Sequence, residues 1–166
     1  MPRWNTIMHS APDSLDAKRS ALALLTRREH SQNELARKLK ARGIQPEAAQ
    51  IAVESLKQQG WQSDERFAQS LARSRASGGH GPLRIRAELA QHGLDSDLIQ
   101  AAIVACETDW NARAAELLAR RFGRTPAKDR NEQAKRGQFL QRRGFDLDAI
   151  RAALRGGPEE SGMGGN

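Results

Sequence analysis

The chain has 166 residues, which is long enough for one or two ordinary domains or for a short array of repeats. Hydrophobic residues make up 38% of it, which argues against one large core, and no stretch approaches the roughly 18 apolar residues of a membrane-spanning helix. Its one cysteine, Cys106, excludes an intramolecular disulfide and a cysteine-rich zinc site, and its formal net charge of +7 favours polyanions or acidic proteins as partners. We therefore expect a soluble, cytoplasmic protein.

The first predicted unit spans residues 15–60 and contains three helices. Ser31 and Glu34 form a capping box, in which the serine accepts from a helical N–H and the glutamate reaches back, so a second helix begins here. Gly43 supplies the left-handed conformation that ends this helix. Pro46 suits the first turn of a third helix.

The second and third predicted units, residues 61–108 and 109–155, repeat this arrangement. Ser63 and Asp109 are good N-terminal caps for the first helix of each unit. The glycine-rich segment 77–82 lacks the Lys-Ser/Thr of a phosphate-binding P-loop, so we interpret it as a connection between two helices. The spacing of apolar residues is helical throughout, and no alternating strand pattern appears.

A recurring pattern relates the three units. Three glycines, each preceded by a basic or imidazole residue and followed by an apolar one, lie 50 and 51 residues apart, and a leucine stands four residues before each: Gly43, Gly93 and Gly144, with Leu39, Leu89 and Leu140. Such a period is typical of repeat arrays. The sequence therefore predicts an all-α fold of three tandem three-helix repeats, which is more typical of a recognition surface than of an enzyme with one cleft.

Residues outside and between the units have simpler interpretations. The termini, residues 1–14 and 156–166, are expected to be flexible. The C-terminal segment is glycine-rich and carries too little apolar surface to offset its ordering entropy. Trp61 and Trp110 fall near the unit boundaries, where packing between units is favoured over stacking on bases. Cys106 lies on an apolar stretch and is expected to be a buried small hydrophobe.

No candidate for catalysis, metal or cofactor binding emerges from the reactive residues. The four histidines lack metal-ligand spacing with each other, and no His/Cys/Asp cluster converges. Glu34 and Glu88 each lie beside an apolar residue on a helix, where capping and surface ion pairing explain them without acid–base chemistry. We therefore expect no enzyme.

Basic residues are unevenly distributed. Residues 17–60 hold nine Lys/Arg and four Asp/Glu (+5), residues 61–108 five and six (−1), and residues 109–155 twelve and six (+6). At about 100° per residue, several arginines and one lysine fall opposite the apolar stripes of their helices. Among them, Arg113, Arg120 and Arg124 are predicted to gather along one side of a single helix. The predicted partner-binding residues are Arg37, Lys40, Arg66, Arg73, Arg84, Arg113, Arg120 and Arg124.

From about residue 17 to residue 154 the chain resembles the RecX family of regulatory proteins. The resemblance rests on the order and spacing of four motifs: Ser31-Gln-Asn-Glu-Leu35, Gly60-Trp-Gln-Ser-Asp64, Gly81-Pro-Leu-Arg-Ile85 and Arg143-Gly144-Phe145. The third unit departs from the pattern, because Arg136 stands where Ile85 stands in the second.

The resemblance implies an elongated, curved molecule that binds the RecA recombinase filament on single-stranded DNA. It also implies inhibition of RecA ATP hydrolysis, strand exchange and co-protease activity. Two other functions are open: a helix-turn-helix DNA-binding protein that uses residues 46–59 as its recognition helix, and a structural adaptor. Residues 46–59 carry one lysine and two glutamates, a poor composition for reading a groove. The sequence leaves open a monomer or a dimer that exchanges segments around Gly78-Gly79.

Overall fold

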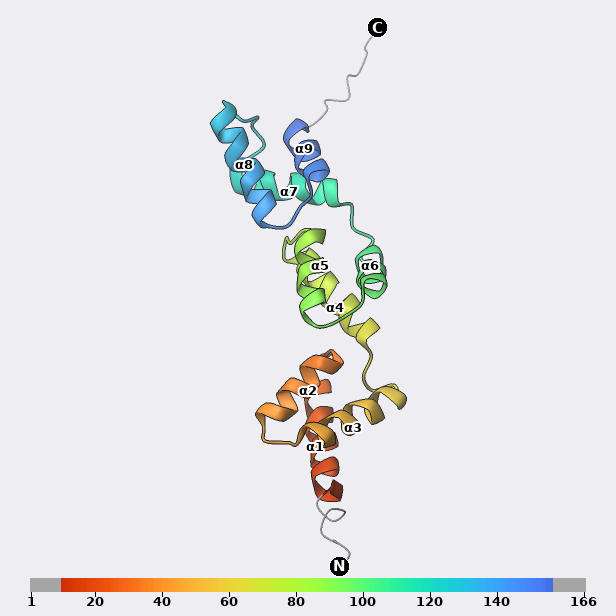
Figure 1. Cartoon of the computed structure of the whole chain (residues 1–166). Helices are drawn as coiled ribbons and strands as arrows, with labels where there is room; N and C mark the ends of the chain where they lie inside the picture. Colours follow the sequence, from red (N-terminus) through yellow and green to blue (C-terminus); the bar gives the residue numbers. More distant parts are fainter. Residues whose placement is uncertain (1–9, 157–166) are drawn as a thin grey trace, which may run out of the picture.

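The computed structural model describes residues 10–156, and side chains from residue 14 onward; the expectations for residues 1–9 and 157–166 lie outside the described residues. The described part folds into helices alone, in three consecutive groups of three that are stacked along one direction, with α1 toward one end of the stack and α9 toward the other (Figure 1). The helices are α1 (Ser10–Leu25), α2 (Gln32–Ala41), α3 (Pro46–Gln58), α4 (Asp64–Ser77), α5 (Pro82–Gln91), α6 (Ser96–Val104), α7 (Trp110–Phe122), α8 (Arg130–Arg142) and α9 (Leu147–Arg155). The predicted all-α array of three three-helix units is confirmed. No helix among these residues is long and apolar enough to cross a membrane.

Helix starts are set by short polar side chains. Six helices have a serine or aspartate that accepts a hydrogen bond from the third helical N–H, which satisfies one of the donors left over at a helix N-terminus: Ser31, Ser63, Asp95, Asp109, Asp129 and Asp146. The expected capping box at α2 is half formed. Ser31 accepts from Glu34 N at 3.1 Å, but the Glu34 carboxylate turns away to Arg28 and Lys38.

The ends of the second helices follow the predicted glycine pattern. Gly43, Gly93 and Gly144 have φ angles of +83°, +76° and +87°, in the region that side chains with a Cβ rarely adopt. After Gly43, the Ile44 N–H donates to Leu39 O at 3.2 Å and closes the helix end. The prediction of left-handed glycines at these helix ends is confirmed.

Each unit has its own small core, in which the first helix packs on the third. The largest buried members include Leu35, Leu39 and Leu56 in the first unit, Phe67, Ile85 and Leu89 in the second, and Leu118, Leu140 and Phe145 in the third. Trp110 packs against both the second and the third core, as predicted for a residue at a unit boundary. Cys106 packs against the second core and is partly buried.

Trp61 is not packed between units. It is 60% exposed, so the expectation of a buried boundary residue is wrong. The reason is that polar side chains fill this boundary: Gln62 is buried beside it and donates to His30 O and to Asp64. Ile51 on α3 is also exposed, at 59%, because at about 100° per residue it lies away from the face that Ala48, Ala52 and Val53 bury.

The second helices of consecutive units meet end to end. At the boundary between the second and third units, Gly81 N donates to Arg143 O at 2.8 Å and Leu83 N donates to Gly144 O at 3.0 Å. The unpaired N–H groups that begin α5 thus meet the unpaired carbonyls that end α8, with the two helix dipoles aligned head to tail.

At the boundary between the first and second units, side chains join the start of α2 to the end of α5. Asn33 Nδ2, in the first turn of α2, donates to His92 O at the end of α5 at 3.0 Å, and Ser31 Oγ lies 3.2 Å from His92 Nδ1. Asp64 accepts from Gln32 N at 2.9 Å. The two boundaries therefore share a geometry but differ in the groups that hold them.

Candidate partner-binding surfaces

The predicted basic residues of the first unit lie on an open groove between α2 and α3. Arg37 and Lys40 are exposed and make no hydrogen bond or ion pair within the part of the chain that the structure describes. The groove has a volume of about 1080 Å³, and the exposed side chain of Ile51 lies along it. Both cations are thus available to a partner, next to an apolar contact.

The predicted basic residues of the second unit differ in availability. Arg66 forms an ion pair with Glu29 of the first unit at 2.8 Å and donates to Gly60 O and Trp61 O, both at 3.0 Å. Its guanidinium therefore holds the boundary between the first two units. Arg73 is exposed, and Arg84 is exposed with a 3.4 Å contact to Arg142 O in the third unit.

The predicted basic residues of the third unit are not equivalent either. Arg113 and Arg120 share the carboxylate of Glu116, at 2.6 and 3.1 Å, and Arg113 also donates to Ser77 O of the second unit at 2.7 Å. The sequence predicts Arg124 on the same helix as Arg113 and Arg120. This prediction is wrong, because α7 ends at Phe122. Gly123, with φ +80°, turns the chain there and carries Arg124 into the following loop.

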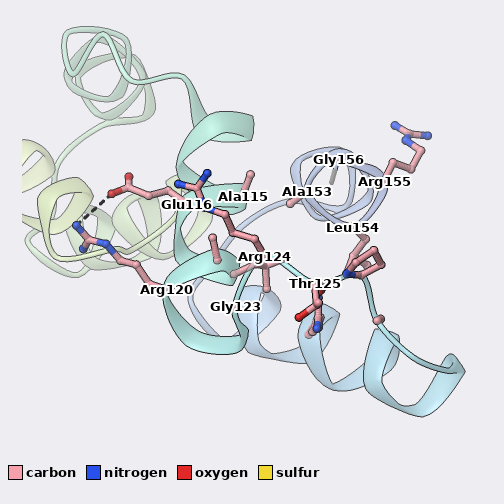
Figure 2. Close-up of a pocket in the computed structure, with 15 residues that line it drawn as sticks. Ala115, Glu116, Arg120, Gly123, Arg124, Thr125, Ala153, Leu154, Arg155 and Gly156 are labelled. Carbon is pink, nitrogen blue, oxygen red and sulfur yellow. Dashed lines mark hydrogen bonds and ion pairs between the residues drawn. The ribbon is translucent and has the colours of Figure 1, made fainter. Parts of the chain in front are cut away.

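This loop forms one wall of a pocket in the third unit (Figure 2). The pocket has a volume of about 820 Å³ and lies between the end of α7, the loop, and the end of α9. Its arginines are Arg120, Arg124, Arg136 and Arg155, its carboxylate is Glu116, and its apolar lining includes Leu118, Ala153 and Leu154.

Arg136 is a site residue that the sequence prediction did not include. It is 7% exposed, and it occupies the position where Ile85 fills the core of the second unit. Nη1 donates to Thr125 O at 2.8 Å, Nη2 pairs with Glu132 at 2.7 Å, and the guanidinium lies 5.4 Å from the centre of the Phe122 ring. Nε is buried without a partner. The signal that could have found it was the charged residue at an otherwise apolar repeat position.

Glu34 lies in a buried cluster and not on the surface, where it was expected. The carboxylate is 5% exposed and pairs with Arg28 and, at 3.1 Å, with Lys38. Burial alone would raise the pKa of Glu34, but the hydrogen bonds from Arg28 and Lys38 and the nearby His30 outweigh it and lower the pKa to about 2. His30 lies beneath this pair, and burial lowers its pKa.

Glu88 resembles Glu34 in its chemistry. The hydrogen bond from Arg75, at 2.6 Å, lowers the pKa of Glu88. Both carboxylates are held ionised by a cation, which is the opposite of what a general acid at neutral pH requires. Within the described residues no group of three or more His, Cys, Asp or Glu side chains is arranged to hold a metal ion.

Comparison with known families matches all three units separately. Residues 17–56 match the first three-helix domain of RecX, residues 63–103 the second, and residues 107–154 the third.

Similar whole proteins carry the same description. "Regulatory protein RecX" of Xanthomonas campestris pv. campestris (strain B100) is 57% identical over 135 residues, which cover 81% of this chain and 83% of the relative. The protein of that name from Stenotrophomonas maltophilia (strain R551-3) is 54% identical over 140 residues, covering 84% and 86%. The crystal structure of RecX from Lactobacillus salivarius superposes with a TM-score of 0.73 at 25% identity, over 87% of this chain and 96% of that one.

Proposed function

The chain belongs to the RecX family, and we propose that it regulates the RecA recombinase by binding along the RecA filament on single-stranded DNA. In this proposal it is a cytoplasmic, non-enzymatic regulator that slows RecA ATP hydrolysis, strand exchange and co-protease activity. An elongated protein that contacts several RecA protomers would hinder the rearrangements that each cycle needs. Weak contacts at separate points would add as avidity.

One observation supports this proposal most directly: unengaged cations stand on both outer units of an elongated array. Arg37 and Lys40 in the first unit, and Arg124 in the third, are exposed and have no hydrogen-bond or ion-pair partner among the described residues. These units carry the +5 and +6 charges, whereas the middle unit carries −1. Acidic protein surface and the DNA backbone are both complementary to such ends.

The helix-turn-helix alternative has less support. Its recognition helix would be α3, whose exposed side chains include Glu47 and Glu54 and only one cation, Lys57. Carboxylates on that face would repel DNA phosphates. Exposed Trp61 is one aromatic residue, while sites for single strands usually use several. We therefore expect weak binding to naked DNA without sequence preference.

The test is RecA ATPase on single-stranded DNA, titrated with this protein. We expect hydrolysis to fall in proportion to occupancy, and the inhibition to weaken as salt is raised. A parallel titration of duplex DNA serves as the control. Unchanged RecA hydrolysis at saturating protein would overturn the proposal, and tight, sequence-selective duplex binding would favour the alternative.

A further inference from the structure

The pocket of the third unit contains a buried donor with nothing to bind. Arg136 lines the pocket with only 7% of its surface exposed, and two of its three nitrogens are satisfied by Thr125 O and Glu132. Nε has no acceptor. A buried donor without a partner is unfavourable, and it marks a place where an acceptor from outside would be stabilised.

Charge around this donor favours an anion. Four arginines line the pocket against one carboxylate, Glu116, which is already paired with Arg120 (Figure 2). Arg124 and Arg155 are exposed and make no ion pair within residues 10–156. The exposed guanidinium groups at the rim can each bind a carboxylate or phosphate through charge-assisted hydrogen bonds.

The apolar lining decides between these two anions. Leu118, Ala153 and Leu154 lie among the arginines, while the described lining of the pocket contains no aromatic side chain. A nucleic-acid strand would leave its bases without a stacking surface here. A peptide that carries an aliphatic side chain beside its carboxylates would fill both parts of the lining. We propose that this pocket binds an acidic peptide segment of a protein partner, with its carboxylates on Arg124, Arg155 and Arg136 and an aliphatic side chain against Leu118 and Leu154.

The inference rests on the proposed function only for the identity of the partner protein. The buried arginine of this pocket has no counterpart in the other described units, because Leu35 and Ile85 stand at the positions equivalent to Arg136 and fill their cores with apolar atoms. The long segment between α7 and α8 supplies Arg124 and Thr125 to the pocket. The site would therefore give one end of the array a specific contact in addition to its net charge.

The test is fluorescence anisotropy with a labelled peptide, Gly-Asp-Leu-Asp-Glu-Gly, and the full-length chain. A matched peptide replaces each carboxylate by its amide. We expect the acidic peptide to bind at least about tenfold more tightly than the amide peptide, which is the change for losing one strong charged contact. Arg124→Ala with Arg155→Ala should weaken acidic-peptide binding about tenfold or more.

Two further variants separate local binding from net charge and folding. Arg19→Ala with Arg42→Ala removes the same two charges from exposed positions of the first unit, and it should change the affinity less than about twofold, since long-range attraction is screened by salt. Arg136→Leu restores the apolar residue of the other units. It should weaken peptide binding while leaving the melting temperature unchanged or higher, whereas a purely structural Arg136 would lower the melting temperature and leave the affinity unchanged.

Three results would overturn the proposal. They are failure of the wild-type chain to bind the acidic peptide, equal affinity in Arg124→Ala/Arg155→Ala, and displacement of the peptide by oligo(dT) whose own affinity falls in the same variant. The last result would assign the pocket to nucleic acid. Because no RecA is present in this assay, it can succeed or fail independently of the ATPase test.

Discussion

At the scale of single residues, Glu34 shows how one ionised group supports a unit. Its carboxylate is buried among Arg28, Lys38 and His30. Lys38 Nζ lies 3.1 Å from His30 Nε2, and His30 Nδ1 lies 2.9 Å from Arg28 O. Because a lysine ammonium can only donate, Nε2 accepts and Nδ1 carries the hydrogen. This neutral form of the ring agrees with burial lowering the pKa of His30.

We predict that Glu34→Gln destabilises the chain by roughly 1–3 kcal/mol at pH 7, because it leaves charged donors without their anion. The pKa of Glu34 is lowered to about 2 from an ordinary value of 4.5. Its stabilising effect is therefore complete above about pH 4.5 and is lost as the pH falls toward 2. Urea unfolding at pH 7 and pH 3 measures this, and the difference between wild type and variant should shrink at pH 3. Glu47→Gln, on the exposed start of α3, is the control; an equal effect there would contradict the prediction.

The capping pattern at Ser31 and Glu34 shows what local sequence can predict. The prediction that α2 begins after Ser31 is confirmed, because an N-terminal cap depends only on residues within three positions of it. The direction of the Glu34 side chain is not local. It depends on how the loop after α1 folds back to place Arg28 over α2, and no spacing within α2 encodes that.

At the scale of helices, the glycines that end α2 and α8 have equivalent backbones but different surroundings. A Cβ added at Gly43 would have no atom within 4 Å. A Cβ added at Gly144 would lie 2.6 Å from the backbone N of Arg84, which is fixed in the first turn of α5. The close approach of α8 to α5 therefore requires glycine at position 144 for two reasons: its positive φ angle and its lack of a Cβ atom.

We predict that Gly43→Ala costs about 1 kcal/mol, the backbone strain alone. Gly144→Ala should cost about 1–3 kcal/mol more, because the extra carbon also separates the two units. Thermal unfolding of both variants measures the difference. Equal losses would show that the contact between Gly144 and Arg84 does not constrain the boundary.

The boundary between the first and second units depends instead on Asp64. Its carboxylate accepts from Gln32 N and from the side chains of Gln32 and Gln62, at 2.9, 3.1 and 2.9 Å. Asp64→Ala should cost about 2 kcal/mol by leaving these donors unpaired. It should also increase hydrogen exchange at the start of α2. Glu65→Ala, one residue along and exposed, is the control, and identical exchange in the two variants would contradict this role.

The helices could be predicted because the signals for their two ends lie close together in the sequence, as in the segment from Ser31 to Gly43. The boundaries could not, because they join residues such as Asn33 and His92, or Gly81 and Arg143, that are about 60 residues apart. The prediction that Trp61 packs between units is wrong for the same reason. Its position near a boundary was correct, but the polar side chains that fill that boundary come from elsewhere in the chain.

At the scale of the whole molecule, the end-to-end contacts of α2, α5 and α8 hold the two basic units at opposite ends (Figure 1). The sequence predicted this order of charge, and it also marked the third unit as exceptional through Arg136. The sequence did not predict which basic residues are free to contact a partner and which are engaged within the protein. Arg66 and Arg113 hold the boundaries between units, while Arg37, Lys40 and Arg124 are unengaged among the described residues.

If the array bridges a filament, both basic ends should be needed together. We predict that Arg37→Glu with Lys40→Glu, and separately Arg120→Glu with Arg124→Glu, each weaken RecA inhibition by about tenfold or more, because losing one end removes avidity as well as contacts. The second pair tests the third-unit end as a whole, and both of its residues line the pocket. Both variants should keep the wild-type helix content in circular dichroism, since all four side chains point away from the cores.

The control for these variants is Arg19→Glu with Arg27→Glu. Both residues are exposed in the first unit and lie outside the predicted set, and the pair changes the net charge equally. Inhibition close to wild type in the control, with strong losses in the other two, would show that position matters and not net charge. Equal losses of inhibition in all three variants would show that the effect is long-range electrostatic attraction, which salt screens over about 10 Å at 0.1 M. Full inhibition by both end variants would contradict bridging, because the contacts that stop RecA would then lie in the middle unit, where Arg73 and Arg84 are the exposed predicted residues.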